Sequence, residues 1–260
     1  MDINLSGKHA VVCGSTQGIG KCTALALSKL GASITLIARN EEKLKETLKA
    51  LTPHKKHDYI VADFSNAEFL ASEVNKWAKI NTAHILVNNT GGPKGGPIRE
   101  AAIEEFTSAF NNHLICNHIL VQALWKGMRE AGYGRIINII STSVKQPLDG
   151  LGVSNTVRGA VANWSKTLAN ELGQFNITVN NVLPGATNTV RLQSIAESKA
   201  AKQTGVNYQE IITQMAQLSP MKRIAEPDEI ANAIVFLASP AASYINGINV
   251  PVDGGRTKSL

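Results

Sequence analysis

Seven short apolar segments alternate with amphipathic or polar segments along the chain, and this alternation constrains the fold more than any other feature. The apolar segments are rich in Val and Ile and cover 9–13, 32–38, 59–63, 84–89, 135–141, 177–185 and 248–255. The segments between them have helical character and cover 18–30, 41–51, 66–79, 103–130, 152–173, 189–218 and 227–238. Strands that alternate with helices form parallel sheets, and strands apolar on both faces are buried on both. The sequence therefore predicts a doubly wound α/β fold with about seven parallel strands and helices on both faces.

The length and composition fit one such domain over residues 1–260. A chain of 260 residues, 43% of them hydrophobic, is long enough to bury a large core. We find no internal repeat and no linker. The polar segment 189–218 is predicted to be an insertion at the active-site edge that serves as a substrate lid, the alternative being a plain surface excursion.

Charge, cysteine content and hydropathy limit the partners that we expect. The net charge is +6, and no basic run alternates with aromatic residues, so we expect no nucleic acid. The three cysteines have neither a disulfide pattern nor metal-ligand spacing, which fits a reducing compartment and no bound metal. No signal peptide and no apolar segment of membrane-spanning length is visible, so we expect no membrane association. These features together predict a cytoplasmic protein.

A glycine-rich turn joins the first predicted strand to the first helix. The sequence GSTQGIG covers residues 14–20, with glycines at Gly14, Gly18 and Gly20. Gly14 permits a tight turn, and Gly18 and Gly20 let backbone N–H groups and the helix dipole approach a pyrophosphate. Ser15, Thr16, Gln17 and Ile19 are expected to line this phosphate loop. Because the turn has a strand before it and a helix after it, the sequence predicts a Rossmann-like nucleotide site.

The spacing Gly-x-x-x-Gly-x-Gly, with motifs further along the chain, resembles the short-chain dehydrogenase/reductase family. NNTGG (88–92), Asn180, PGATNT (184–189) and VDGG (252–255) resemble the corresponding motifs of that family. The resemblance covers essentially the whole chain. It implies a cofactor site that includes Asp63, Phe64, Asn89, Gly91, Pro184, Gly185 and Thr189. It also implies a homodimer or homotetramer and a small-molecule substrate.

The end of the second predicted strand indicates which dinucleotide binds. NAD-dependent enzymes place an acidic residue there to accept a hydrogen bond from the ribose 2′-OH. Here the position is Ala38, followed at once by Arg39. A guanidinium can bind a 2′-phosphate through two parallel charge-assisted hydrogen bonds, and Asn40 could add another donor. The sequence therefore predicts NADP(H) as the cofactor.

The residues that the resemblance assigns to catalysis depart from the family pattern. The family has a Ser after the fifth strand, a Tyr thirteen residues further on, a Lys four residues beyond the Tyr, and an Asn on the preceding long helix. Ser141 matches the Ser, whereas Ser154 and Arg158 fall on the Tyr and Lys positions. Both still share one helix face at i, i+4 spacing. Ungapped counting puts His113 on the Asn position, and a one-residue shift would put Asn112 there.

These replacements change the acid–base chemistry that we expect. A Ser hydroxyl is a far weaker acid than a phenol, and Arg stays protonated and cannot relay a proton as Lys can. His113 could supply the proton, because its unperturbed pKa of about 6.5 suits transfer near neutrality. A water held by Ser141, Ser154 and His113 is the other candidate. Arg158 could bind the nicotinamide ribose or an anionic group of the substrate.

The sequence leaves three functions open. The first is an NADP(H)-dependent oxidoreductase with an altered acid–base set, acting on a carbonyl or hydroxyl group and similar to a 3-oxoacyl reductase. The second is a non-redox lyase, hydratase or isomerase on the same scaffold, in which Ser141, His113 and Arg158 bind an anionic intermediate. The third is a catalytically silent NADP(H)-binding protein.

Overall fold

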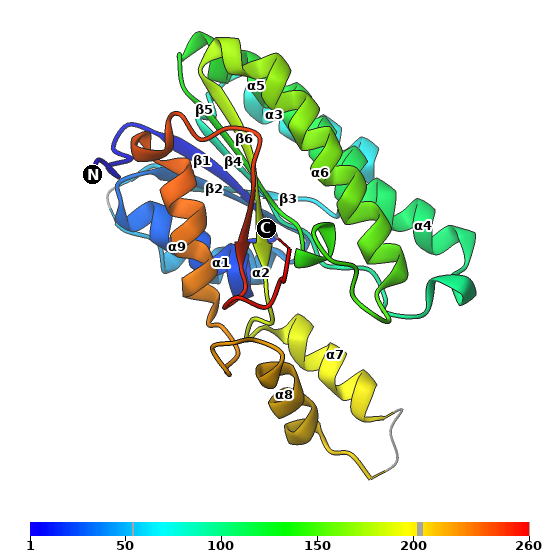
Figure 1. Ribbon diagram of the computed structural model, residues 1–260. Helices are drawn as coiled ribbons and strands as arrows, with labels where there is room; N and C mark the ends of the chain where they lie inside the picture. The colour runs from blue at the N-terminus through cyan, green and yellow to red at the C-terminus, as the bar shows by residue number, and fades with distance from the viewer. Residues whose placement is uncertain (54, 202–204, 260) are drawn as a thin grey trace.

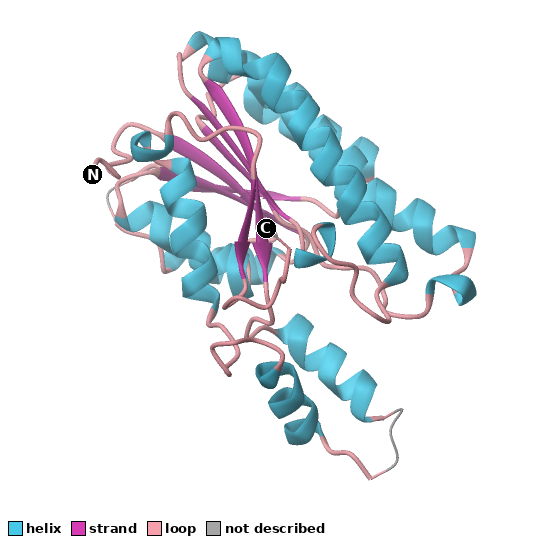
Figure 2. Ribbon diagram, in the orientation of Figure 1, coloured by secondary structure: helices cyan, strands magenta, loops and turns pink. Residues whose placement is uncertain are grey.

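The computed structural model describes residues 1–53, 55–201 and 205–259 and contains one seven-stranded sheet in the order β3-β2-β1-β4-β5-β6-β7 (Figures 1 and 2). All six strand pairs are parallel. The strands are β1 (His9–Cys13), β2 (Ser33–Ala38), β3 (Asp58–Val61), β4 (Ile85–Asn88), β5 (Gly134–Ile139), β6 (Ile177–Pro184) and β7 (Asn249–Val252). The predicted parallel α/β fold is therefore confirmed.

Helices cover both faces of the sheet, as the two-sided apolar strands require. The helices are α1 (Gly18–Lys29), α2 (Glu41–Lys49), α3 (Ala67–Ala78), α4 (Ile103–Phe110), α5 (Cys116–Glu130), α6 (Gly152–Leu172), α7 (Val190–Ala200), α8 (Tyr208–Gln217) and α9 (Pro227–Ala238). Buried side chains of α1, α2 and α9 form the core on one face, and those of α3, α5 and α6 form it on the other. Figure 1 shows these two helical layers on either side of the strands.

The long helix predicted over 103–130 differs from the structure in one respect. It consists of α4, a π-helical turn η2 (Asn111–Ile115) and α5. A π-helical turn accommodates an extra residue within a helix and is frequent at functional sites. The turn contains both Asn112 and His113, so it decides which of the two side chains reaches the site.

The segment 189–218 contains two helices, α7 and α8, which contact each other and project from the body of the molecule (Figure 1). Residues 202–204 of this segment lie outside the described residues. The two ends of the projection are tied to each other at its base: the N–H of Asn188 donates to the carbonyl oxygen of Ala225 at 2.8 Å, and the N–H of Ala225 donates to that of Ala186 at 2.9 Å.

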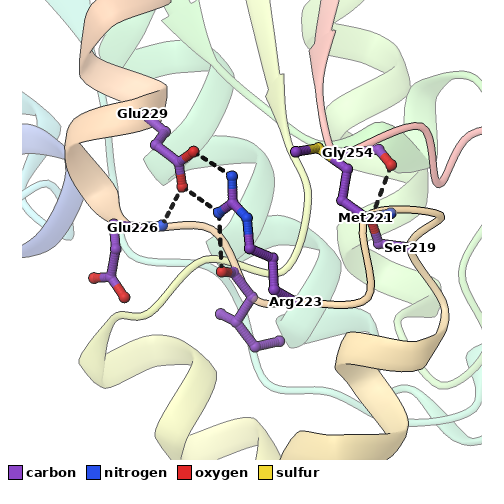
Figure 3. A network of polar contacts seen from close by, with 7 residues as sticks. Ser219, Met221, Arg223, Glu226, Glu229 and Gly254 are labelled. Atoms are coloured by element: carbon purple, nitrogen blue, oxygen red, sulfur yellow. Dashed lines mark hydrogen bonds and ion pairs between the residues drawn. The ribbon is translucent and has the colours of Figure 1, made fainter.

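A network of polar contacts holds the chain where it returns from α8 (Figure 3). Ser219 Oγ donates to the carbonyl oxygen of Gly254 at 2.9 Å. The guanidinium of Arg223 makes two bonds of 2.6 Å to the carboxylate of Glu229, which also accepts from the backbone N–H of Glu226. The network joins α9, the return segment and the turn after β7, so the base of the projection is fixed to the sheet.

Asparagine side chains form a row across the centre of the sheet, which the sequence did not predict. Asn88, Asn138, Asn181 and Asn249 are register partners on four adjacent strands. Asn88 Nδ2 donates to Asn138 Oδ1 at 2.8 Å, and Asn138 Nδ2 donates to Asn181 Oδ1 at 3.0 Å and to Ser165 Oγ at 2.9 Å. Asn181 Nδ2 continues the row to Asn249 at 2.8 Å. The row joins four strands beneath the end of the sheet that carries the site.

Replacing Asn138 by Leu is expected to lower the free energy of unfolding by about 3 kcal/mol. The change removes three hydrogen bonds and leaves the buried amide of Asn88 without an acceptor, and an unsatisfied buried group costs about 1–3 kcal/mol. Urea unfolding measures the effect. Asn170→Ala, on the exposed face of α6, is the control and is expected to stay within about 0.5 kcal/mol. An Asn138→Leu variant as stable as the wild type would show that the row contributes nothing to stability.

Candidate active site

The glycine turn between β1 and α1 leaves space that side chains would fill. Gly14 and Gly18 have φ values of +57° and +51°, in the left-handed region that favours glycine. A Cβ atom on Gly20 would lie 2.2 Å from the carbonyl oxygen of Gly14, so Gly20 allows α1 to approach the end of β1. Asn89, after β4, donates from its side chain to the same oxygen at 3.2 Å. The turn is therefore held open and rigid in front of the N-terminus of α1.

A cavity of about 490 Å³ lies at the carboxyl ends of the strands and extends from this turn. In doubly wound sheets, ligands bind at this end, where the strand order reverses between β1 and β4. Most of the predicted cofactor and catalytic residues line the cavity: Gly14, Thr16, Gln17, Gly18, Ile19, Arg39, Asp63, Phe64, Asn89, Gly91, Ser141, Ser154, Arg158, Pro184, Gly185 and Thr189. The structure thus brings together residues from seven separate stretches of the chain.

Four predicted residues do not line this cavity. Ser15 is fully buried, and its hydroxyl lies 3.5 Å from the carbonyl oxygen of Ile37. Gly20 lies within α1. Asn40 lines an adjoining hollow, and its side-chain oxygen caps α2 by accepting from the backbone N–H of Lys43 at 2.9 Å. His113 is the fourth.

The side chains of the cavity where β2 and β3 end suit a phosphorylated ribose. Arg39 is exposed, follows β2 directly, and lines both the cavity and the adjoining hollow. Asp63 accepts from the backbone N–H of Ser65 at 2.9 Å, and this bond is the main cause that lowers the pKa of its carboxyl, to which Arg39 adds. Asp63 is therefore an ionised acceptor, while Arg39 presents a guanidinium to the rim.

Ser141 and Arg158 line the part of the cavity near the end of β5. Ser141 follows β5, and its Oγ accepts from the backbone N–H of Ser143 at 3.1 Å, which leaves its hydroxyl hydrogen free for another acceptor. Arg158 belongs to α6, is only 8% exposed, and donates from Nη1 to the carbonyl oxygen of Ile139 at 2.9 Å. Ser154 lies one turn earlier on the same helix face, as predicted. Burial, with a smaller contribution from the nearby Arg191, lowers the pKa of Arg158 to about 10.

The π-helical turn places Asn112 and His113 in different surroundings. Asn112 lines the cavity, whereas His113 is 2% exposed and its Nδ1 is hydrogen-bonded to the hydroxyl of Thr90. Burial lowers the pKa of His113 to about 2, and the charges of Arg158 and Arg191 contribute. The imidazole is therefore neutral near pH 7. It lacks the second, acidic ring proton of an imidazolium, which weighs against the predicted role of His113 as the acid.

Buried histidines predict that stability falls as the solution is acidified. The pKa of His113 is about 2 and burial lowers that of His9 to about 4, whereas an unfolded His titrates near 6.5. Below pH 6.5 the unfolded chain therefore binds two protons that the folded chain does not. Each contributes a loss of about 1.4 kcal/mol per pH unit, ending near pH 4 for His9. Urea unfolding between pH 7 and pH 5 measures the slope, and His9→Gln is expected to reduce it. An unchanged slope in that variant would contradict the assignment.

Several residues at the site were not identified from the sequence. Arg191 lies two positions beyond Thr189, the N-cap of α7, and its side chain bonds the carbonyl oxygen of Pro93 in the loop after β4. The apolar cavity residues Leu151, Val190, Leu192 and Ile195 come from the start of α6 and from α7. The sequence did offer a signal for Arg191: it stands two positions after a motif that ends in a helix cap, and such a position lies near the mouth of a site.

Comparisons with known proteins agree with this geometry. A family model described as enoyl-(acyl carrier protein) reductase matches residues 14–257. The NADPH-dependent reductase BacG of Bacillus subtilis is 31% identical over 260 residues, covering 98% of this chain and 100% of the relative. The 3-oxoacyl-[acyl-carrier-protein] reductase FabG of Pseudomonas aeruginosa is 32% identical over 263 residues, covering 99% and 100%. The crystal structure of L-sorbose reductase from Gluconobacter frateurii, complexed with NADPH and L-sorbose, has a TM-score of 0.93 at 34% identity and full coverage of both chains.

The chain belongs to the short-chain dehydrogenase/reductase family. The predicted enzyme class, an NADP(H)-dependent short-chain oxidoreductase, is confirmed at the level of the family by these relatives. The relatives named here span several substrates, so they leave the substrate of this chain open. Among the described residues, no helix has the length and apolar character needed to span a membrane.

Proposed function

We propose that this protein is an NADPH-dependent reductase that transfers hydride to the carbonyl group of a small molecule, with an acid–base set that lacks the Tyr and Lys of its family. The observation that carries the proposal is the shared cavity. A glycine turn suited to a pyrophosphate, Arg39, and the group Ser141, Ser154 and Arg158 all line it. Its volume of about 490 Å³ lies in the range of small-molecule sites.

The residues of the chain fit NADPH. The left-handed Gly14 and Gly18 leave room and backbone N–H groups for the pyrophosphate before α1, where the helix dipole favours an anion. Arg39 would hold the 2′-phosphate, since no carboxylate stands at the end of β2 to repel it. Asp63 and Asn89 would contribute polar groups to the adenosine and nicotinamide halves. When bound, NADPH supplies the hydride.

Ser141 would polarise the substrate carbonyl. Because its Oγ accepts from the N–H of Ser143, the hydroxyl can donate its own hydrogen to a carbonyl oxygen in the cavity. Negative charge develops on that oxygen as a hydride adds to the carbonyl carbon. A donor aimed at the developing charge from a rigid loop stabilises the transition state more than the ground state.

Arg158 would stabilise the same oxygen by its charge. It stays protonated at neutral pH even after burial, so it cannot act as the proton source. The proton would come from a water held by Ser141 and Ser154, both of which line the cavity, and the hydroxide left behind would take up a proton from bulk solvent. The neutral His113 would fix Thr90 and the loop after β4 rather than donate a proton.

The missing phenol favours a second candidate, a catalytically silent NADP(H)-binding protein. The four tyrosines are Tyr59, Tyr133, Tyr208 and Tyr244, and none of them lines the cavity. A non-redox lyase or isomerase would use the same charged group without any change in the cofactor. The silent protein would bind NADPH without converting any substrate. The non-redox enzyme would convert its substrate without oxidising NADPH.

Two further features of the proposed enzyme concern its surroundings. Helix α7 contributes Val190, Arg191, Leu192 and Ile195 to the cavity wall, which supports a lid role for this part of the chain. A homodimer or homotetramer stays a prediction from the family, and sedimentation velocity measures it directly.

The experiment that tests the proposed function follows the cofactor. The protein is titrated with NADPH and with NADH by cofactor fluorescence and then incubated with NADPH and a panel of ketones, oxo acids and 3-oxoacyl thioesters. The proposal expects preferential NADPH binding and oxidation of NADPH with at least one carbonyl compound. Tight binding without oxidation across the panel would favour the silent protein, and no binding of either cofactor would refute the reductase.

A further inference from the structure

Two arginines, Arg158 and Arg191, line the cavity, and no carboxylate of the described residues forms an ion pair with either. Arg158 is 8% exposed; its Nη1 bonds a backbone carbonyl and its Nε has no partner among the described residues. Arg191 reaches from α7 to the loop after β4, where its Nη2 bonds the carbonyl oxygen of Pro93. The ion pairs that the described residues form all lie at the surface and include neither arginine.

The two guanidinium groups repel each other at a place where water screens them poorly. Burial lowers the pKa of both guanidinium groups. The charge of Arg191 lowers the pKa of Arg158 further, and the charges of both arginines lower the pKa of His113. Asp63 is the single acidic residue of the described cavity lining, and it lies at the other end, beside Arg39. No carboxylate of the described cavity wall compensates the buried charge of Arg158 or the partly buried charge of Arg191, and unpaired charges away from water are costly.

An anion from outside the chain would remove this cost. We propose that Arg158 and Arg191 together bind a carboxylate of the substrate, and that Arg191 is a specificity-determining residue for short oxo acids. A guanidinium offers parallel N–H donors that match the two oxygens of a carboxylate. Ser141 and Ser154 line the same cavity as both arginines, so a short oxo acid would present its carbonyl oxygen and its carboxylate to Arg158 together, with Arg191 adding donors to the carboxylate alone. The inference rests on the proposed function, because it takes this cavity to be the substrate site.

The anion that the pair holds has one other possible source, a phosphate of the cofactor. Arg191 lies near the glycine turn through Thr189, whose methyl group would be 3.0 Å from a Cβ on Gly18. The Nε atom of Arg191 would be 3.3 Å from a Cβ on Gly92, in the loop after β4. The loss of Arg191 therefore has to be measured against substrate and cofactor separately.

The test compares acids with their neutral esters. Phenylpyruvate and acetoacetate, each paired with its methyl ester, are titrated by calorimetry into the protein with and without saturating NADPH. The variants are Arg191→Gln, Arg191→Lys and, as a control, Arg99→Gln, which alters an arginine that is largely exposed and outside the cavity. Thermal melting checks that each variant is folded. Arg191→Lys keeps the positive charge and loses the planar guanidinium. The affinity for the acids can therefore still be compared in this variant if Arg191→Gln does not fold.

We expect at least one acid to bind the wild type at least tenfold more tightly than its ester. Arg191→Gln is expected to lower the affinity for that acid about tenfold or more, and Arg191→Lys is expected to lower it less. Arg99→Gln should leave this affinity unchanged. The Kd for NADPH should stay within about twofold in all three variants. Equal binding of acids and esters, or no binding of either acid, would overturn the inference. So would a loss of NADPH affinity in Arg191→Gln, which would assign the pair to a cofactor phosphate. A wild type that binds no NADPH would refute the proposed function instead, and the cofactor-free titrations would still decide the arginine pair.

Discussion

Replacing Ser141 by Ala is expected to lower kcat about 10²–10³-fold while the affinity for NADPH stays unchanged. The hydroxyl is held by the N–H of Ser143 and lines the cavity at the end where Arg158 lies, so its hydrogen can reach the oxygen that gains charge. An interaction made mainly in the transition state affects kcat and kcat/KM alike, whereas lost ground-state binding would raise KM alone. Steady-state oxidation of NADPH with the carbonyl compound found active in the panel measures both constants.

Two further variants show whether the effect belongs to Ser141. Ser33→Ala removes a hydroxyl at the start of β2, at the opposite end of the strands from the cavity, and should leave kcat unchanged. Ser154→Ala should lower kcat less than Ser141→Ala, because another water can replace the one that Ser154 holds. If Ser141→Ala retained full kcat, the polarising role would be wrong and Arg158 alone would have to stabilise the oxygen.

An Arg39→Ala variant is expected to lose NADPH affinity by about 10–100-fold and to bind NADH as the wild type does. The guanidinium follows β2 at the rim of the cavity and would make charge-assisted hydrogen bonds to the 2′-phosphate, each worth about 1.5–3 kcal/mol. NADH has no such phosphate, so its affinity should not depend on Arg39. Fluorescence titration with both cofactors gives the two dissociation constants.

Salt and a second arginine serve as controls for this prediction. The preference for NADPH should shrink as salt rises, because Arg39 is exposed and its charge is screened. Arg99→Ala, which removes one exposed positive charge elsewhere, should leave both constants unchanged. Parallel losses for NADPH and NADH in Arg39→Ala would show that the residue supports the fold of the rim rather than the phosphate.

Patterns that depend on neighbouring residues were predictable from the sequence. The strands that are apolar on both faces predicted the parallel sheet, and Gly14 and Gly18 predicted the turn, because both features are determined by local periodicity and backbone geometry. Arg39 was predictable for the same reason, since its place relative to β2 decides where it lies.

Features that depend on packing between distant segments were not predictable. The π-helical turn changed which side chain reaches the cavity, so Asn112 lines it and His113 does not. The low pKa of His113 comes from its burial and from two arginines distant in sequence. The row of asparagines becomes visible only when the strands are in register, because each Asn alone is an ordinary polar residue within a strand.

The measurement that tests the central claim most directly follows the hydride itself. The protein is incubated with NADPH deuterated at the transferring position of the nicotinamide and with the active carbonyl compound, and the product is analysed by mass spectrometry. The proposed reductase predicts a product that carries a single deuterium on the former carbonyl carbon, formed in step with oxidation of the cofactor. Product without deuterium, or NADPH that binds and is never oxidised, would contradict it.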